Sequence, residues 1–261
     1  MNVPRLVSRY DENGVAVLLL NSPNSLNAFT LEMVSELSAA VTELTVNEPA
    51  KPLVISGAGK AFSAGGNLKA IHQNILAGEP ERYISEIVPA VERLFLQLLH
   101  YPGPTLSFLN GAAVGGGLNL AMVCDFRVMR QNAVLRLGFT DIGLTPGTGG
   151  SFFFTRILGL PRALSLSLLG GQITSTDALS WGLVNEVVGN DQNLAEVITE
   201  WSPKLTSLNP NLVLSVRSLM YQSLNTSIED QMVGERLELL KASQTSYHAR
   251  RVSDVMDRIS R

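Results

Sequence analysis

Short apolar runs of strand length alternate along the chain with longer segments whose apolar residues recur at helical spacing. The run "AVLLLN" follows "RLVSRY" across a turn of Asp, Asn and Gly, which predicts a β-hairpin near the beginning. Further on, "PLVISGAG", "TLSFLNG", "FRVMR" and "AVLRLGF" have the length and content of buried strands. Repeated strand and helix units with buried strands predict an α/β fold.

Helical periodicity is clear directly after the first loop, "NSPNSLNAF". Thr30 is a suitable N-cap for a helix whose apolar positions are Met33, Leu37, Val41 and Leu44. Another helix is expected over residues 81–99. We therefore expect helices to alternate with the strands through the first half of the chain.

After Gly149 the pattern turns mostly helical, with "LVNEVVG" as a last strand. The polar, Gly- and Pro-containing stretch 74–82 is the best candidate for a mobile loop, with Glu81 and Tyr83 as lid residues.

Composition narrows the function. The chain has 261 residues, of which 45% are apolar, enough for a large core, and a net charge of −3 that gives nucleic acid no basic face to bind. Cys124 is the single cysteine, which excludes a disulfide framework, and the three histidines lack metal-ligand spacing, so we expect no metal. The sequence has neither a membrane-length apolar run nor a signal-peptide pattern, and we expect a cytoplasmic protein.

Two segments end a strand, continue through glycines and begin a helix: "KAFSAGGNLK" (60–69) and "NGAAVGGGLNLA" (110–121). Glycine lets the backbone approach a ligand closely, and a helix start leaves N–H groups unpaired. Two such N–H groups from separate loops can converge on one oxygen and stabilise an enolate or a tetrahedral anion. Either run alone is equally typical of a tight packing turn.

Taken together with "NSLNAF", "IGLTPGTGG", "RILGLPRA" and "ITSTDALSWGLVNEVV", these segments make the chain resemble the crotonase superfamily, the enoyl-CoA hydratases and isomerases. The resemblance implies a spiral of β-β-α turns in residues 1–195 and a helical trimerisation region in residues 196–261. A homotrimer or hexamer is implied as well. The substrate is expected to be an acyl-CoA or acyl-carrier thioester, with no cofactor besides the CoA that the substrate carries and no membrane partner.

The resemblance also assigns roles. Gly66 and Gly116 match the two positions whose N–H groups hold the thioester oxygen. Asn67 stands where the family commonly has Asp. The residues expected to contact the substrate are Leu26, Ala28, Ala64, Gly65, Asn67, Leu68 and Phe139.

The glutamates of the hydratases are absent. Asn119 and Phe139 occupy their positions, and Gly147 replaces the aspartate of the isomerases that have Phe at the second position. Hydration needs a base and an acid around a positioned water, which Asn and Phe do not supply. Asp141 remains as a candidate acid if strand alternation places it on the side of Phe139, and Asn119 as a candidate hydrogen-bonding residue.

Three readings of the reaction stay open. Double-bond isomerisation through an enolate ranks first, and decarboxylation of an acyl thioester second. The third is a protein that binds thioesters without chemistry. Hydrolysis ranks below these, because Ser63 and Thr145 have no obvious activating partner. His72 and His248 are expected to be exposed rather than to carry protons in the reaction.

Overall fold

The computed structural model describes residues 5–260, and its contacts divide the chain into two units, Met1–Thr206 and Ser207–Arg261. The strands are β1 (Val7–Glu12), β2 (Val15–Leu20), β3 (Leu53–Gly57), β4 (Ala61–Ser63), β5 (Thr105–Leu109), β6 (Ala112–Val114), β7 (Phe126–Arg130), β8 (Leu135–Arg136) and β9 (Glu186–Val188). The helices of the first unit are α1 (Leu31–Asn47), α2 (Leu68–Leu76), α3 (Arg82–Leu99), α4 (Gly116–Met122), α5 (Gly150–Leu158), α6 (Leu160–Leu169), α7 (Ser175–Ser180) and α8 (Leu194–Thr206), with 3-10 turns η1 (Pro23–Ser25) and η2 (Thr140–Ile142).

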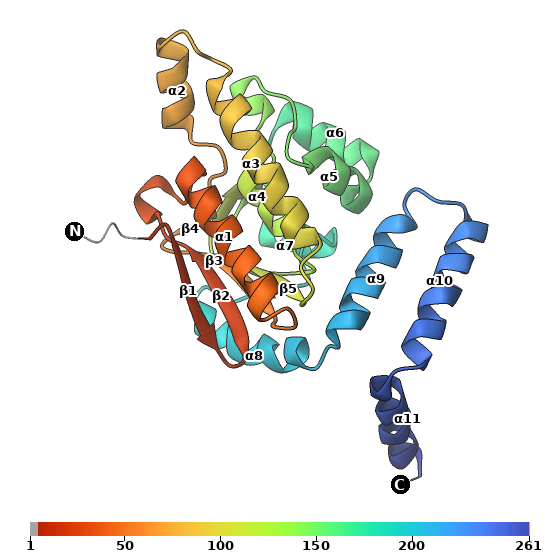
Figure 1. The fold of residues 1–261 in the computed structure, drawn as a ribbon. Coiled ribbons are helices and arrows are strands. Elements are labelled where there is room, and N and C mark those ends of the chain that lie inside the picture. The colour runs from red at the N-terminus through yellow and green to blue at the C-terminus, as the bar shows by residue number, and fades with distance from the viewer. Residues whose placement is uncertain (1–4, 261) are drawn as a thin grey trace. The chain divides into compact units, whose positions relative to one another are not determined.

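Two sheets form the first unit. The larger has the order β1-β2-β3-β5-β7-β9, and the smaller has the order β4-β6-β8. Only β1 and β2 pair antiparallel, as the predicted hairpin; the other neighbours in both sheets run parallel. Strands that follow one another, such as β3 and β4 or β5 and β6, lie in different sheets and lead into helices (Figure 1). The successive turns β3–β4, β5–β6 and β7–β8 each add one strand to each sheet, which confirms the expected β-β-α spiral.

Both faces of the larger sheet are covered at its central strands β2, β3 and β5, which explains why these strands are buried along almost their whole length. Helix α1 begins after Thr30, whose side chain accepts a hydrogen bond from Met33 N as expected, and it packs against α3 (Figure 1). On one face of the sheet, Val17 and Phe108 belong to a buried cluster that α8 completes through Val197, Ile198, Trp201 and Leu205. Parallel strands buried in this way are near-continuous apolar runs.

The division between the two units differs from the expected boundary at 195/196. The contacts place it after Thr206, because α8 belongs to the core cluster of the first unit. The second unit contains α9 (Pro210–Gln222), α10 (Ile228–Ser243) and α11 (Ser246–Ile259), of which α9 and α10 pack together. The expected trimerisation role of this helical region stays a prediction. No helix within residues 5–260 combines the length and the apolar character that crossing a membrane requires.

Glycines sit where the chain passes from the larger sheet to the smaller one. A Cβ atom built on Gly111, between β5 and β6, would lie 2.1 Å from the carbonyl oxygen of Lys60, between β3 and β4. Gly57, at the end of β3, is equally tight: its Cβ would lie 2.3 Å from the carbonyl oxygen of Ala61. Because backbone atoms cannot move aside as a side chain does, these crossings tolerate no side chain.

We expect Gly111→Ala to lower the free energy of unfolding of the first unit by about 3 kcal/mol, because the added methyl group forces two backbone segments apart. Urea denaturation followed by circular dichroism measures the change. Gly234→Ala is the matched control. Gly234 lies inside α10, and a Cβ atom built on it would meet only Leu219 Cδ2, at 3.8 Å. Ala is also a better helix former than Gly. Equal stability of Gly111→Ala and wild type would contradict the crossing argument.

Candidate active site

A cavity of about 280 Å³ lies within the first unit, where loops from successive turns of the spiral meet. The connection between β4 and α2 contributes Ala64 and Gly66, and the connection between β6 and α4 contributes Gly115 and Gly116. Helix α3 supplies an apolar wall that includes Ile87. The segment from β8 to α5 closes the cavity with Arg136, Gly138, Phe139, Asp141, Ile142, Leu144 and Thr148.

The two glycine loops press against one another. A Cβ on Gly65 would lie 2.4 Å from Val114 O and 2.9 Å from Gly116 N, and Gly65 has φ +72°. Across the same contact, a Cβ on Gly117 would lie 2.4 Å from Ser63 O. Only glycine fits this approach, and it fixes the β4–α2 loop beside the start of α4.

Gly66 and Gly116 both line the cavity. Gly116 is the first residue of α4, where a backbone N–H has no partner in its own helix. No carbonyl or side chain within residues 5–260 accepts a hydrogen bond from Gly66 N or Gly116 N. The two amides are therefore available to a ligand in the cavity.

Tyr83 ties the first loop to the segment before α1. Its hydroxyl accepts from Asn67 N at 2.9 Å and donates to Phe29 O at 2.8 Å, and Phe29 N donates to Gly65 O. Burial raises the pKa of the Tyr83 phenol, so the group stays protonated and keeps its donor role. The expectation that Tyr83 is a lid residue is wrong: it is 7% exposed and holds the loop that carries Gly66.

One ion pair contributes to the cavity wall. Arg136 Nη2 donates to Asp141 Oδ2 at 2.8 Å, and both side chains are partly exposed. The Arg136 Nε atom is buried and has no hydrogen-bond partner among the described residues. A charged group in an apolar cavity is costly unless it is paired, so the pair allows both charges to stay there.

The segment around Phe139 is not the strand that the pattern "AVLRLGF" predicts. Strand β8 contains only Leu135 and Arg136, because Gly138 has φ +70° and Phe139 is already helical at φ −69° and ψ −46°. Asp141 lies in η2, so alternation along a strand does not explain its position. Phe139 and Asp141 nevertheless line the same cavity, as expected, because the tight turn brings them together.

Asn119 is fully buried and is absent from the cavity lining. Its Nδ2 donates to Gly147 O and to Thr148 Oγ1, both at 2.9 Å, while its Oδ1 finds no partner among residues 5–260. Thr148 has φ +48°, a strained conformation for a β-branched residue. Asn119 therefore holds the loop between η2 and α5, and Thr148, rather than Asn119, reaches the cavity.

The predicted site residues divide into two groups. The structure brings Gly66, Gly116, Ala64, Leu68, Phe139 and Asp141 to one cavity. The remaining ones, which do not line it, are Leu26, Ala28, Gly65, Asn67 and Asn119. Leu26 is 38% exposed with φ +54°, and Asn67 caps α2 by accepting from Ala70 N. His72 and His248 are exposed, as expected.

The cavity contributors that the sequence did not reveal include the apolar wall from α3, Arg136 and Thr148. The apolar wall from α3 has the signal of helical spacing at Ile84, Ile87 and Val91, but such spacing equally describes a core-facing helix. Arg136 had a signal as a cation in an otherwise apolar strand, and Thr148 had none. Among the described residues no group of three or more His, Cys, Asp or Glu could hold a metal ion.

The sequence and the fold are both similar to those of known proteins. A family model described as enoyl-CoA hydratase/isomerase matches residues 10–254. The 1,2-epoxyphenylacetyl-CoA isomerase of Escherichia coli is 31% identical over 87% of this chain and 84% of its own. The ethylmalonyl-CoA decarboxylase of Mus musculus is 29% identical over 86% of this chain and 69% of its own. The crystal structure of an enoyl-CoA hydratase from Polaromonas superposes with a TM-score of 0.89 at 26% identity, covering 97% of each chain.

We expect Asn119→Ala and Asn119→Asp each to lower the free energy of unfolding by about 2 kcal/mol, because both leave the Gly147 carbonyl and the Thr148 hydroxyl without their buried donor. The Asp variant keeps the size of the side chain but replaces the amide donor by a carboxyl group, while the Ala variant removes the donor without adding an ionisable group. Urea denaturation measures both. If Asn119→Asp were as stable as wild type, the amide would not be acting as a donor to this loop.

Proposed function

The chain belongs to the enoyl-CoA hydratase/isomerase family, and from this membership we propose that it moves the double bond of an acyl thioester through an enolate. The observation that carries the proposal is the pair of free amides, Gly66 N and Gly116 N, at one cavity. Donors fixed before the reaction stabilise a developing oxyanion without reorganisation, and this is commonly the largest contribution to such catalysis. In this proposal, the thioester oxygen binds between the two amides.

Asp141 is the base in this proposal, because it is the one carboxylate among the residues that line the cavity. It removes a proton from C2 of a 3-enoyl thioester, and the electron pair passes into the carbonyl oxygen to give a dienolate. The protonated carboxyl then returns the proton to C4, and the double bond ends between C2 and C3. A single carboxyl group suffices, since it acts first as base and then as acid.

Hydration fits the cavity less well. Adding water across a double bond requires a second group to activate the water, and Phe139 stands at one of the two positions where the hydratases carry glutamate. Asn119, at the other position, uses its amide hydrogens on Gly147 and Thr148. Isomerisation therefore ranks above hydration.

Decarboxylation of a malonyl-type thioester is the second candidate. Arg136 is a cation in the cavity lining that can attract a substrate carboxylate, and a relative is named as a decarboxylase. In that reaction the bond between Cα and the carboxylate breaks, CO₂ leaves, and the same two amides stabilise the enolate before Cα takes a proton. A protein that binds thioesters without chemistry is the remaining alternative.

The wider assignments stay proposals too. The thioester is carried by CoA or by an acyl-carrier protein, and no cofactor is required beyond it. We propose a homotrimer or hexamer assembled through the helical region that follows the spiral, in the cytoplasm.

We expect Gly66→Pro to lower the turnover number by about 10² to 10³, because it removes one of the two N–H donors. Gly66→Ala is the matched control: it keeps the N–H, and its Cβ meets nothing nearer than Ile71 Cδ1 at 3.6 Å. The assay is a panel of 2-enoyl-, 3-enoyl- and malonyl-type CoA esters. If wild type turns over none of them while Gly66→Pro binds CoA esters as wild type does, the catalytic proposal fails.

We expect Asp141→Asn to lower the isomerisation rate by about 10² to 10⁴, the usual contribution of a positioned base. In deuterium oxide, we expect the wild-type enzyme to incorporate deuterium into the thioester and the variant to lose this exchange. Mass spectrometry of the thioester measures the incorporation. Decarboxylation of malonyl-type esters, which needs no base, should fall far less. Unchanged exchange in Asp141→Asn would remove Asp141 from the reaction.

A further inference from the structure

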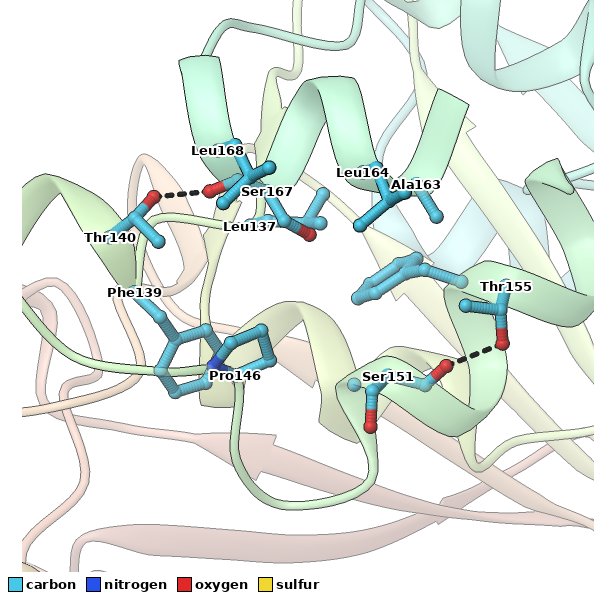
Figure 2. A pocket seen from close by; sticks show the side chains of 12 residues that line it. Leu137, Phe139, Thr140, Pro146, Ser151, Thr155, Ala163, Leu164, Ser167 and Leu168 are labelled. Atoms are coloured by element: carbon cyan, nitrogen blue, oxygen red, sulfur yellow. Dashed lines mark hydrogen bonds between the residues drawn. The ribbon is translucent and has the colours of Figure 1, made fainter. Parts of the chain in front are cut away.

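A second cavity, of about 180 Å³, lies behind the first in the same unit, between the β8–α5 segment and helices α5 and α6. Figure 2 shows Phe139 and Pro146 at one end of it, with Ala163, Leu164 and Thr155 at the other. None of the side chains that line it is ionisable. This space suits an apolar group.

Two of the four hydroxyl groups in its lining, those of Thr140 and Thr155, donate to backbone carbonyl groups, whereas Ser151 and Ser167 contribute the other two. Thr140 Oγ1 donates to Ser167 O, and Thr155 Oγ1 donates to Ser151 O at 2.6 Å (Figure 2). Both protons are therefore unavailable to a ligand. A charged occupant would lose its water without gaining an ionic partner, because no ionisable side chain lines the cavity, and this disfavours it.

Phe139 separates the two cavities, since it alone among the described residues lines both. Its ring lies between two glycines: a Cβ built on Gly115 or on Gly147 would lie 3.7 Å from ring atoms, an ordinary contact distance. Gly115 directly precedes Gly116, one of the two amides proposed to hold the thioester oxygen. The Phe139 ring therefore stands beside the proposed position of the thioester, at the boundary of the second cavity.

We propose that the second cavity binds the far end of the acyl chain and that Phe139 sets the chain length the enzyme accepts. This inference rests on the proposed thioester function and adds to it a substrate class, unbranched apolar acyl groups too long for the first cavity. Ligand sites commonly have volumes of about 300 to 1,000 Å³. The volume of the first cavity, about 280 Å³, is just below this range, and the two cavities together fall within it.

The test uses saturated acyl-CoA esters, from butanoyl- to decanoyl-CoA, which bind but contain no double bond to move. Calorimetric titration gives their dissociation constants. We expect wild type to gain up to about fourfold in affinity for each methylene that enters the second cavity, the effect of burying one CH₂ group.

Variants that fill the second cavity should remove that gain. Ser167→Phe places a ring inside the lining, and Leu168→Trp fills it from a side chain that is 68% exposed and so places little demand on folding. We expect decanoyl-CoA to bind about tenfold more weakly or worse in both, while butanoyl-CoA stays within about twofold, because the longer ester loses several buried methylenes. Ser165→Phe, an exposed position on the same helix that lines neither cavity, is the matched control and keeps the wild-type series.

Phe139→Ala tests the dividing wall. It removes the ring and should raise the affinity for decanoyl-CoA relative to butanoyl-CoA. An unchanged ratio between the two esters in Ser167→Phe and Leu168→Trp overturns the proposal. The proposal is also overturned if those variants change the size of the assembly but not that ratio. Another copy of the chain would then cover the second cavity. If wild type binds no acyl-CoA at all, the thioester function itself fails, which the butanoyl-CoA titration reveals separately.

Discussion

The close approach of backbone between successive turns of the spiral is the constraint on which the site depends. Gly65 meets Val114 O, and Gly117 meets Ser63 O, at distances where a Cβ atom would be 2.4 Å from each oxygen. This contact places the end of one strand-to-helix loop against the start of the next helix. Two unpaired amides then face one cavity because neither can find a partner in its own element. The donor pair thus follows from how the spiral is packed.

Uncharged side chains hold the loops that surround the contact between the two glycine segments. Asn27 is fully buried and donates to the carbonyl groups of Ala58, Ala61 and Phe62, while Asn119 performs the same task for the loop before α5. Such amides satisfy buried backbone groups without bringing a charge into the interior. The charged wall is left to Arg136 and Asp141, which neutralise each other. The ionisable side chains of the cavity wall are therefore confined to one side of it.

The sequence was sufficient where local rules decide the structure. The hairpin, the Thr30 cap with its helix, and the two glycine loops all follow from short patterns, and all are present. It was insufficient where distant segments decide. Asn119 looks equally able to face a ligand or a loop, and only the packing of residues 147–150 against α4 determines which. The turn at Gly138 breaks a pattern that otherwise resembles a strand, and no period of two or 3.6 residues reveals it.

Phe139 stands at the boundary between the two cavities. An ionised side chain at this position would stand between two cavities, one of them without any ionisable group in its lining, and would have to be paired to stay charged. Arg136 is the nearest cation in that wall, and Asp141 already pairs with it. A phenyl ring removes this electrostatic cost and makes the boundary apolar on both sides. In the proposed reaction, the apolar ring at this position leaves Asp141 as the one carboxylate among the residues that line the first cavity.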